Sequence, residues 1–138
     1  MFITESELKS VAYGYQLQQI VENDSTIIQM AIDTAIEEAS AYLSARYDCN
    51  TIFSRTGADR NALLLELCKD IALWYIIRLS NVDMLYEPVK DRYDRAIDWL
   101  NRVAKSVISP NLPLATDENG DTQYPIRYGT MDKQQYDY

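Results

Sequence analysis

The sequence predicts an all-α protein, in which a small helical bundle surrounds a central apolar helix and a non-helical C-terminal arm or hairpin follows. The 4 glycines and 4 prolines among 138 residues are few for an all-β protein with many turns. Apolar residues recur at helical spacing in three long segments. Three of the prolines follow residue 109, where a continuous helix is excluded. We therefore divide the chain into a helical bundle domain (1–108) and an extended C-terminal arm (109–138).

Two helix-start signals lie within the first 25 residues. Thr4 to Glu7 has the form of a capping box and predicts a short helix. Asn23 to Ser25 can accept bonds from free N–H groups and predicts a longer helix that runs to about Tyr47. Its apolar stripe consists of Ile28, Ile32, Ala35, Ile36, Ala39, Tyr42 and Leu43. We expect a loop at residues 48–58 and a cap at Asp59 for the next helix.

The central helix is expected from about Arg60 to Leu79. Apolar residues cover almost every face of this segment, and its narrow polar stripe consists of Glu66, Lys69 and Asp70. A helix that is apolar nearly all round is buried on most sides, so we expect the other helices to pack about it. Cys68 lies within this pattern and is expected to be a free buried thiol, not the disulfide partner of Cys49.

The last helix shows the cleanest amphipathic pattern in the chain. Glu87-Pro88 opens it, because proline is tolerated in the first turn. Its apolar positions are Val89, Tyr93, Ala96, Ile97, Leu100, Val103, Ala104 and Val107. Trp99 lies beside this stripe, and two interpretations remain open: it extends the buried face, or it marks a surface for a partner.

The C-terminal arm carries the remaining candidate interface residues. Asn119-Gly120 could close a β-hairpin between residues 112–114 and 124–126. About thirty residues cannot form a core alone, and tyrosine is enriched at interfaces. We therefore expect the arm to have no intramolecular site and to bind neighbouring chains. The candidate interface residues are Trp99, Tyr124, Ile126, Arg127, Tyr128, Tyr136 and Tyr138.

No residue pattern predicts catalysis, a metal site or a cofactor. The chain contains no histidine, the commonest general base and metal ligand. Its two cysteines do not have zinc-site spacing, and no glycine-rich phosphate motif is present. Asp91, Asp94 and Asp98 share a helix face, where a solvated ion-pair surface is favoured over a metal cluster. The acidic segment 117–121 fits a turn better than a calcium loop.

The charge balance and hydropathy limit the partners. The net charge of -8, from 13 basic and 21 acidic residues, argues against a primary nucleic-acid binder. No secretory signal is recognisable, and no apolar run approaches the ~20 residues that a membrane span needs. We therefore expect a cytosolic protein, or one that assembles in the cytosol, without a membrane partner.

Four motifs together resemble a known group of proteins. They are Tyr42-Leu43-x-x-Arg46-Tyr47, Leu65-x-x-Cys68-x-Asp70-Ile71-Ala72-x-Trp74-Tyr75, Arg92-Tyr93-x-x-Ala96-x-x-Trp99-Leu100 and Tyr124-Pro125-Ile126-Arg127-Tyr128. In order and spacing the chain resembles the Mu-like group of tailed-phage head–tail connector proteins, the adaptors that complete the head beneath the portal. Relatives tend to place a glycine after the last helix, whereas residues 105–109 contain none, which leaves the direction of the arm open.

This resemblance implies a structural virion protein that is not an enzyme. The implied partners are further copies of the chain in a ring, the portal protein and tail-side connector proteins, with DNA passing through without specific binding. The implied location is the virion, after assembly in the host cytoplasm. Two alternatives are an acidic helical regulatory module, such as an inhibitor or DNA mimic, and an enzyme that uses carboxylates alone, such as a glycosidase.

Overall fold

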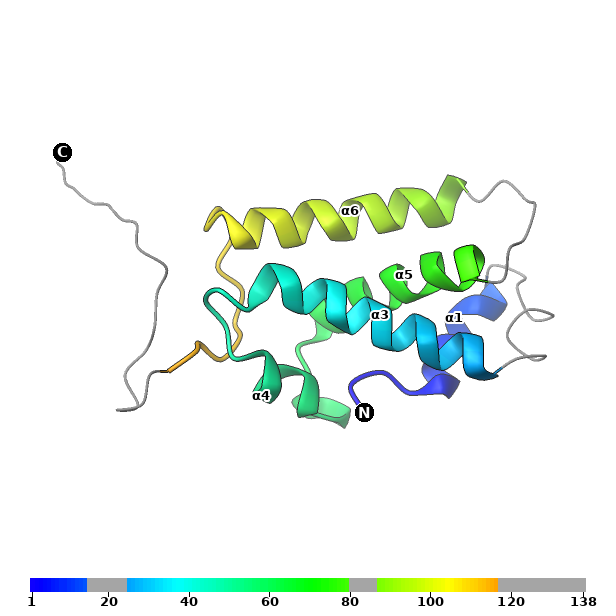
Figure 1. Cartoon of the computed structure of the whole chain (residues 1–138), viewed down its shortest axis with the longest axis horizontal. Coiled ribbons are helices and arrows are strands. Elements are labelled where there is room, and N and C mark those ends of the chain that lie inside the picture. The colour runs from blue at the N-terminus through cyan, green and yellow to red at the C-terminus, as the bar shows by residue number, and fades with distance from the viewer. Residues whose placement is uncertain (15–24, 80–86, 117–138) are drawn as a thin grey trace, which may run out of the picture.

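The computed structural model describes residues 1–14, 25–79 and 87–116, and this part of the chain is all-α. Its helices are α1 (Glu5–Gly14), α3 (Ser25–Leu43), α4 (Cys49–Ser54), α5 (Ala62–Leu79) and α6 (Glu87–Ala104), with a 3-10 turn η1 (Gly57–Asp59). Helices α3, α5 and α6 run along the long axis of the bundle (Figure 1). Helix α1 lies toward one end of them, and α4 and residues 109–116 lie at the other (Figure 1).

Helix α5 forms the centre of the bundle, as the sequence predicts. It packs against α3, α6 and α1. Its buried residues are Leu64, Leu65, Cys68, Ile71, Ala72, Leu73, Ile76 and Ile77. Cys68 is a free thiol in this core, and burial raises its pKa to about 12, so the thiol stays protonated and inert at neutral pH.

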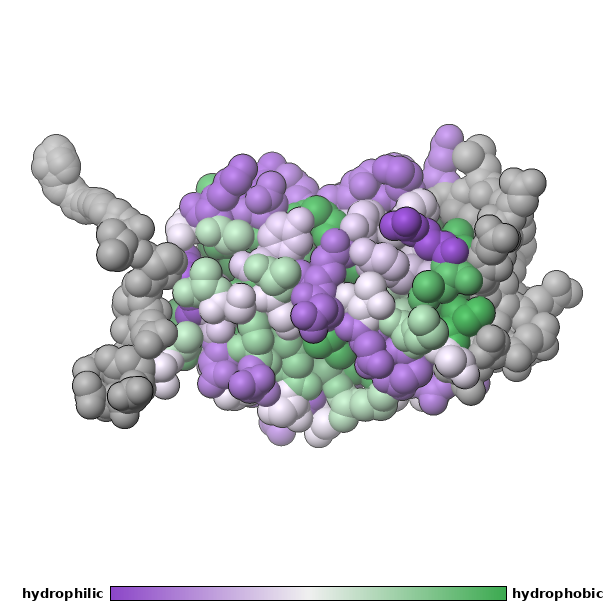
Figure 2. All heavy atoms as spheres, in the orientation of Figure 1, coloured by the Kyte–Doolittle hydropathy of each residue, from purple (hydrophilic) through white to green (hydrophobic). Residues whose placement is uncertain are grey.

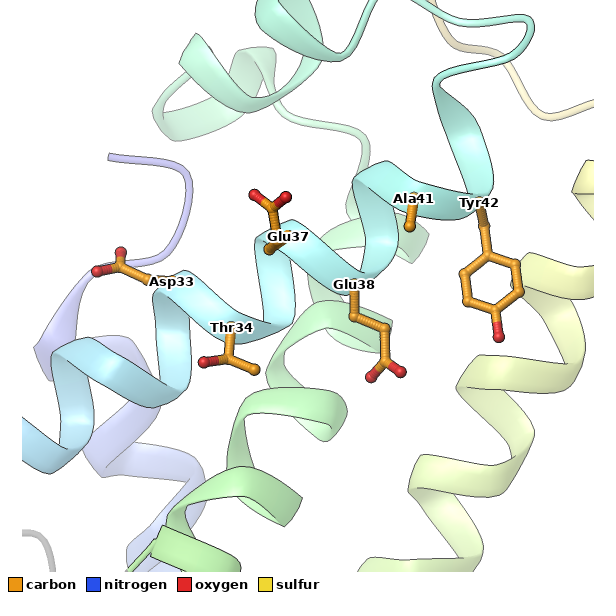
Figure 3. Close-up of a pocket in the computed structure, with 6 residues that line it drawn as sticks. All are labelled: Asp33, Thr34, Glu37, Glu38, Ala41 and Tyr42. Atoms are coloured by element: carbon orange, nitrogen blue, oxygen red, sulfur yellow. The ribbon is translucent and has the colours of Figure 1, made fainter.

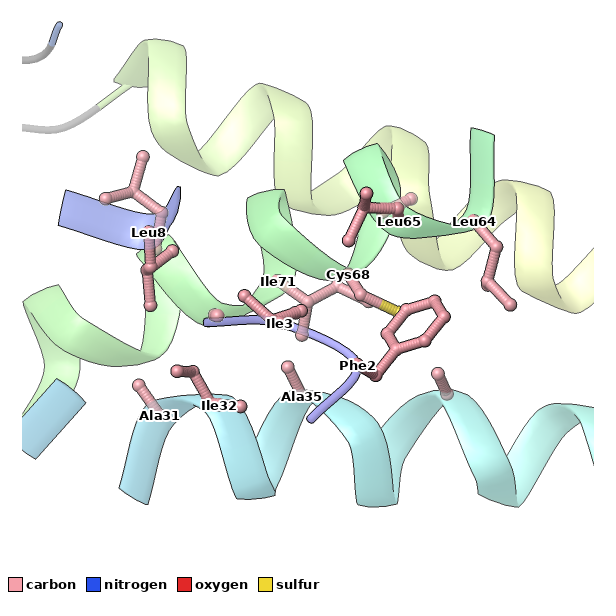
Figure 4. Packing of buried hydrophobic residues seen from close by; sticks show 14 of the residues in the cluster. Phe2, Ile3, Leu8, Ala31, Ile32, Ala35, Leu64, Leu65, Cys68 and Ile71 are labelled. Carbon is pink, nitrogen blue, oxygen red and sulfur yellow. The ribbon is translucent and has the colours of Figure 1, made fainter. Parts of the chain in front are cut away.

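The segment before α1 completes the core. Phe2 and Ile3 are fully buried and lie in the layer between α3 and α5, where α3 presents small alanine side chains (Figure 4). Arg60 holds this segment in place: its guanidinium donates to the Phe2 carbonyl oxygen at 2.8 Å and to both carboxylate oxygens of Glu7 at 2.9 Å. Glu7 also closes the predicted capping box, since it accepts from the Thr4 N–H at 3.0 Å. The capping box is therefore confirmed.

The expected loop at residues 48–58 is wrong, because residues 49–54 form α4 and residues 57–59 form η1. Asp48 caps α4 by accepting from the Thr51 N–H at 3.2 Å and from its hydroxyl at 2.6 Å. Ile52 is buried, and the Phe53 ring meets the Phe2 ring edge-on at 5.0 Å. A helix of 6 residues shows too few apolar positions for its periodicity to be recognised.

The cap of α5 also differs from the prediction. Asp59 belongs to η1, and Asn61 caps α5 by accepting from the Leu64 N–H at 2.9 Å. Helix α3 ends at Leu43, four residues earlier than expected, since the backbone of residues 46–48 pairs with the arm instead.

Helix α6 ends at a serine whose backbone adopts the left-handed conformation, a position where glycine is the usual residue. Ser106 has φ 64°, its N–H donates to the Val103 carbonyl, and the Val107 N–H donates to the Arg102 carbonyl. These two bonds form a Schellman motif, the helix end that glycine usually provides. Arg46 donates to the Ser106 hydroxyl at 2.9 Å and so ties this end to the turn after α3. The direction of the arm, left open by the sequence, is set here for residues 107–116.

The first residues of the arm are held by the bundle, so the expectation that the arm has no intramolecular site is wrong for residues 109–116. Leu112 belongs to the core, and Tyr47 and Leu114 form an antiparallel bridge. The Asp48 N–H donates to the Pro113 carbonyl, and the Ala115 N–H donates to the Arg46 carbonyl, each at 2.9 Å. The predicted hairpin needs residues 124–126, which lie outside the described residues.

We expect Ser106→Val to lower the free energy of unfolding by about 1–2 kcal/mol, because a β-branched residue is strained at positive φ. Ser106→Gly removes the strain but also the bond from Arg46, so it should stay within about 1 kcal/mol of the parent. Urea unfolding followed by circular dichroism measures both. Equal stability of the valine and glycine variants would contradict the left-handed cap.

A second prediction concerns acid stability. The hydrogen bonds from Arg60 lower the pKa of Glu7 from 4.5 to about 2. The stabilisation is therefore present above pH 4.5 and is lost as the pH falls toward 2. Glu7→Gln should cost about 2 kcal/mol at pH 7, and this difference should shrink between pH 4.5 and 2. Glu5→Gln, in the same first turn but without the Arg60 contact, is the control and should cost less at pH 7. A pH-independent difference would contradict the ion pair's role.

Candidate interaction surfaces

Trp99 is the only predicted interface residue within the described part of the chain. It is half-buried and packs against the core, so it extends the buried face of α6 while keeping part of its surface open. The other candidates, Tyr124, Ile126, Arg127, Tyr128, Tyr136 and Tyr138, lie outside the described residues. The structure therefore places one predicted interface residue and does not test whether the others gather near it.

One ion pair joins α5 and α6 on the side of α6 that carries Trp99. Arg92 on α6 approaches Asp70 on α5, with 3.9 Å between Nη1 and Oδ1. Trp99 follows Arg92 by two helical turns and so lies on the same side of α6. Leu63 is 52% exposed, and Val107, just beyond the end of α6, is 69% exposed.

Two arginines flank Trp99 along α6. Arg95, Trp99 and Arg102 stand at positions i, i+4 and i+7 of α6 and so share one face of the helix. Arg95 and Arg102 are both exposed, and Arg102 pairs with Asp98 at 3.0 Å. Acidic and basic residues alternate along α6 and are equal in number, so its exposed side carries both charges. Hydrophilic side chains also follow α6 along the edge of the face seen in Figure 2.

The other flank of α6 is tied to α3 by a shared carboxylate. Glu38 on α3 accepts from the Tyr75 hydroxyl at 3.0 Å and from the Tyr93 hydroxyl at 3.1 and 3.2 Å. The Tyr93 ring also contacts the Trp74 ring at 5.8 Å. Burial, reinforced by the Glu38 charge, raises the pKa of both phenols, so they remain hydrogen-bond donors well into the alkaline range. The cluster joins α3, α5 and α6.

An acidic depression lies on α3 beside this cluster. It has a volume of about 700 Å³ and is lined by Asp33, Thr34, Glu37, Glu38, Ala41 and Tyr42 (Figure 3). Glu38 and Tyr42 point toward one side of α3, and Asp33 and Glu37 point away from it (Figure 3). Asp33 accepts from the Gln29 amide at 2.8 Å, whereas Glu37 is exposed and makes no ion pair with any described residue. We call this depression the α3 acidic groove.

Two of the three α6 carboxylates, Asp94 and Asp98, form ion pairs as the sequence predicts, whereas Asp91 forms none with a described residue. Asp94 pairs with Lys90 and Asp98 pairs with Arg102, each at 3.0 Å. No group of three metal-ligand side chains occurs within residues 1–14, 25–79 and 87–116. The acidic segment 117–121 lies outside these ranges. Across the same ranges, none of the helices combines the length and the apolar character that a membrane crossing requires.

Sequence reasoning missed the Glu38 cluster and the α3 acidic groove. One signal for the cluster was available, since half-buried tyrosines usually find a hydrogen-bond partner and Glu38 directly precedes Ala39 of the apolar stripe. No comparable signal exists for the ion pair between Arg92 and Asp70, because it depends on the register between two helices.

Comparison with known proteins gives one family. The model of the family described as Bacteriophage Mu, Gp36 matches residues 2–125, which include the whole bundle and the start of the arm. No match was found among curated proteins or among solved structures.

We expect Tyr93→Phe to lower the free energy of unfolding by about 1–2 kcal/mol at pH 7, because it removes a donor to a half-buried carboxylate. The raised pKa of Tyr93 means that this stabilisation is present below pH 10, the ordinary value, and is lost at higher pH. Tyr42→Phe is the matched control, and its cost should stay below about 0.5 kcal/mol. Equal costs for the two variants in urea unfolding would contradict the cluster.

Proposed function

The chain belongs to the Bacteriophage Mu Gp36 family, and from this membership we propose that it is a structural virion protein, a head–tail connector adaptor that docks beneath the portal ring. As a Mu-like phage protein it belongs to a family that is not known as an enzyme family. The proposed partners are further copies in a ring, the portal protein and tail-side connector proteins. Its proposed place is the virion, after assembly in the host cytoplasm.

The observation that carries the proposal is the anchored start of the arm. The backbone of residues 113–115 is bonded to Arg46 and Asp48, and Leu112 is fixed in the core. Arg46 in turn holds Ser106, so both ends of the turn into the arm are attached to the bundle. The rest of the arm therefore starts from a defined point at one end of the molecule (Figure 1). An exit point fixed in this way supports the proposal that the arm contacts a neighbouring subunit at this end of the bundle.

The net charge of the chain fits a protein that lies beside DNA without binding to it. A net charge of -8 repels the phosphate backbone, which would let a duplex pass through a ring without adhering. The alternative, an acidic regulatory module that mimics DNA, needs a dense acidic face. On α6, however, Asp94 and Asp98 are neutralised by neighbouring bases.

The proposal is tested by mixing the full-length chain with the portal protein of the same phage and measuring mass by analytical ultracentrifugation. We expect a complex containing both proteins. The combined substitution of Tyr124, Ile126 and Tyr128 by alanine should weaken it by at least about tenfold, because buried aromatic anchors dominate interfaces. Arg55→Ala, at an exposed position after α4, is the control and should bind as the parent.

Two results would contradict the proposal: no complex with the portal at any concentration, or full binding by the triple variant. Competition with DNA for a phage repressor or nuclease would instead favour the regulatory alternative. Unfolding curves of every variant distinguish loss of binding from loss of folding.

A further inference from the structure

The described part of the arm has a strand edge without a partner among the described residues. Pro113 and Ala115 bond to the backbone of residues 46–48, at the end of the bundle that carries α4 (Figure 1). Because backbone groups alternate in direction along a strand, the N–H and C=O of Leu114 point away from this pairing. Neither group bonds to another described residue. Thr116, the next residue on this edge, is exposed. We call Leu114 and Thr116 the open edge.

A pocket lies beside the open edge. It has a volume of about 360 Å³ and is lined by side chains of residues 44–50 and by Ala115 and Thr116. Tyr47, one of these residues, stands opposite Leu114 in the antiparallel bridge, so the two side chains share one face. When a strand adds to an edge, backbone hydrogen bonds give affinity and pockets for alternate side chains give specificity. The open edge and this pocket offer both parts of a strand-binding site.

Residues 122–128 of the chain itself show the pattern of a strand. Every second residue is β-branched or aromatic, which favours extended structure. These residues are Thr122, Tyr124, Ile126 and Tyr128. In such a strand their N–H groups all point to one edge, whereas Pro125, which has no N–H, belongs to the other edge. The segment therefore predicts a strand with one complete edge for pairing and one edge interrupted by proline.

A tight hairpin fits this strand poorly to the open edge of its own copy. A two-residue turn at Asn119-Gly120 pairs Glu118 with Asp121, and like charges directly opposite each other are destabilising. The same turn places Pro125 opposite Leu114, so the Leu114 carbonyl gains no donor. Both mismatches follow from the turn and not from the strand.

The tight turn also directs the wrong side chains toward the bundle. Leu112 and Leu114 pack against the core, so the residues opposite them share the face that meets the bundle. With the turn at Asn119-Gly120, the residues opposite them are Arg127 and Pro125, and the apolar residues of the strand face away. A shift of one residue reverses the two faces. A strand from a second copy is not bound by the turn and can take the shifted register.

We propose that residues 122–128 of one copy pair as a β-strand with the open edge of the next copy, with Tyr124 and Ile126 turned toward its bundle. A tyrosine of this strand then approaches the pocket at Tyr47. The contact joins two different surfaces, so it is head-to-tail and closes into a ring when the rotation between copies allows it. This inference rests on the proposed function, since it names how the arm of one connector subunit would hold its neighbour.

The test uses two full-length variants that each lose one half of the contact, measured by sedimentation equilibrium. Thr116→Pro removes an N–H from the open edge, and Ile126→Pro removes an N–H from the pairing edge of the strand. Each alone should lower the association constant at least about tenfold, because a hydrogen-bonding partner is left unsatisfied. An equimolar mixture of the two should form a dimer and stop there. The intact strand of the Thr116→Pro chain fills the intact edge of the Ile126→Pro chain, and no second contact remains.

The controls keep the backbone groups of the contact. Thr116→Val retains the N–H of the open edge, and Arg127→Pro removes an N–H only from the outer edge of the strand, so both should associate as the parent does. Thr116 is exposed, so its variants should fold, and thermal unfolding checks this. If Thr116→Pro lowers the melting temperature, the comparison of Ile126→Pro with Arg127→Pro decides between the two edges of the strand by itself.

The outcomes separate this inference from the proposed function. A parent that stays monomeric at all concentrations, proline variants that associate normally, or a mixture without a dimer would each overturn the inference. Slow hydrogen exchange at the Leu114 amide of a monomeric parent would do the same, since it would place the strand on its own copy. Portal binding that persists in those cases would leave the proposed function standing. Dimers in the mixture of a chain that never binds the portal would support the strand exchange and overturn the connector role.

Discussion

Burial of α5 between α3, α6 and α1 is the constraint on which the rest of the structure depends. Eight of its side chains are buried, so the other helices must each turn an apolar stripe toward it. This requirement fixes the register of α6 against α5, where Arg92 approaches Asp70. The same packing leaves Trp99 half-buried against the core and Arg95 and Arg102 exposed. Which side chains of α6 remain accessible is thus a consequence of how the core is packed.

At the edge of this core, some charged side chains form hydrogen bonds within the molecule. Glu38 is used within the molecule by Tyr75 and Tyr93, and Arg60 is used by Glu7 and the Phe2 carbonyl. No buried polar side chain occurs within the part of the chain that the structure describes. The polar contacts that join the helices therefore lie at the edge of the core and not within it.

Much of the fold could be predicted from the sequence because long amphipathic segments carry a strong periodic signal. The spacing of apolar residues predicted α3, α5 and α6 and the central place of α5. It could not reveal α4, whose 6 residues depend on the Asp48 cap and on the contact of Ile52 and Phe53 with the core. Nor could it predict a left-handed serine at Ser106, since glycine is the usual residue there. The Glu38 cluster was not predicted, because it joins residues of three different helices.

Contact with copies of itself and with the portal is the proposed role of this chain. Cryo-electron microscopy of the intact phage that encodes it tests this proposal most directly, since it shows both position and contacts. We expect a closed ring of this chain between the portal and the tail. A virion that lacks the chain, or one that carries it away from the portal, would contradict the proposal.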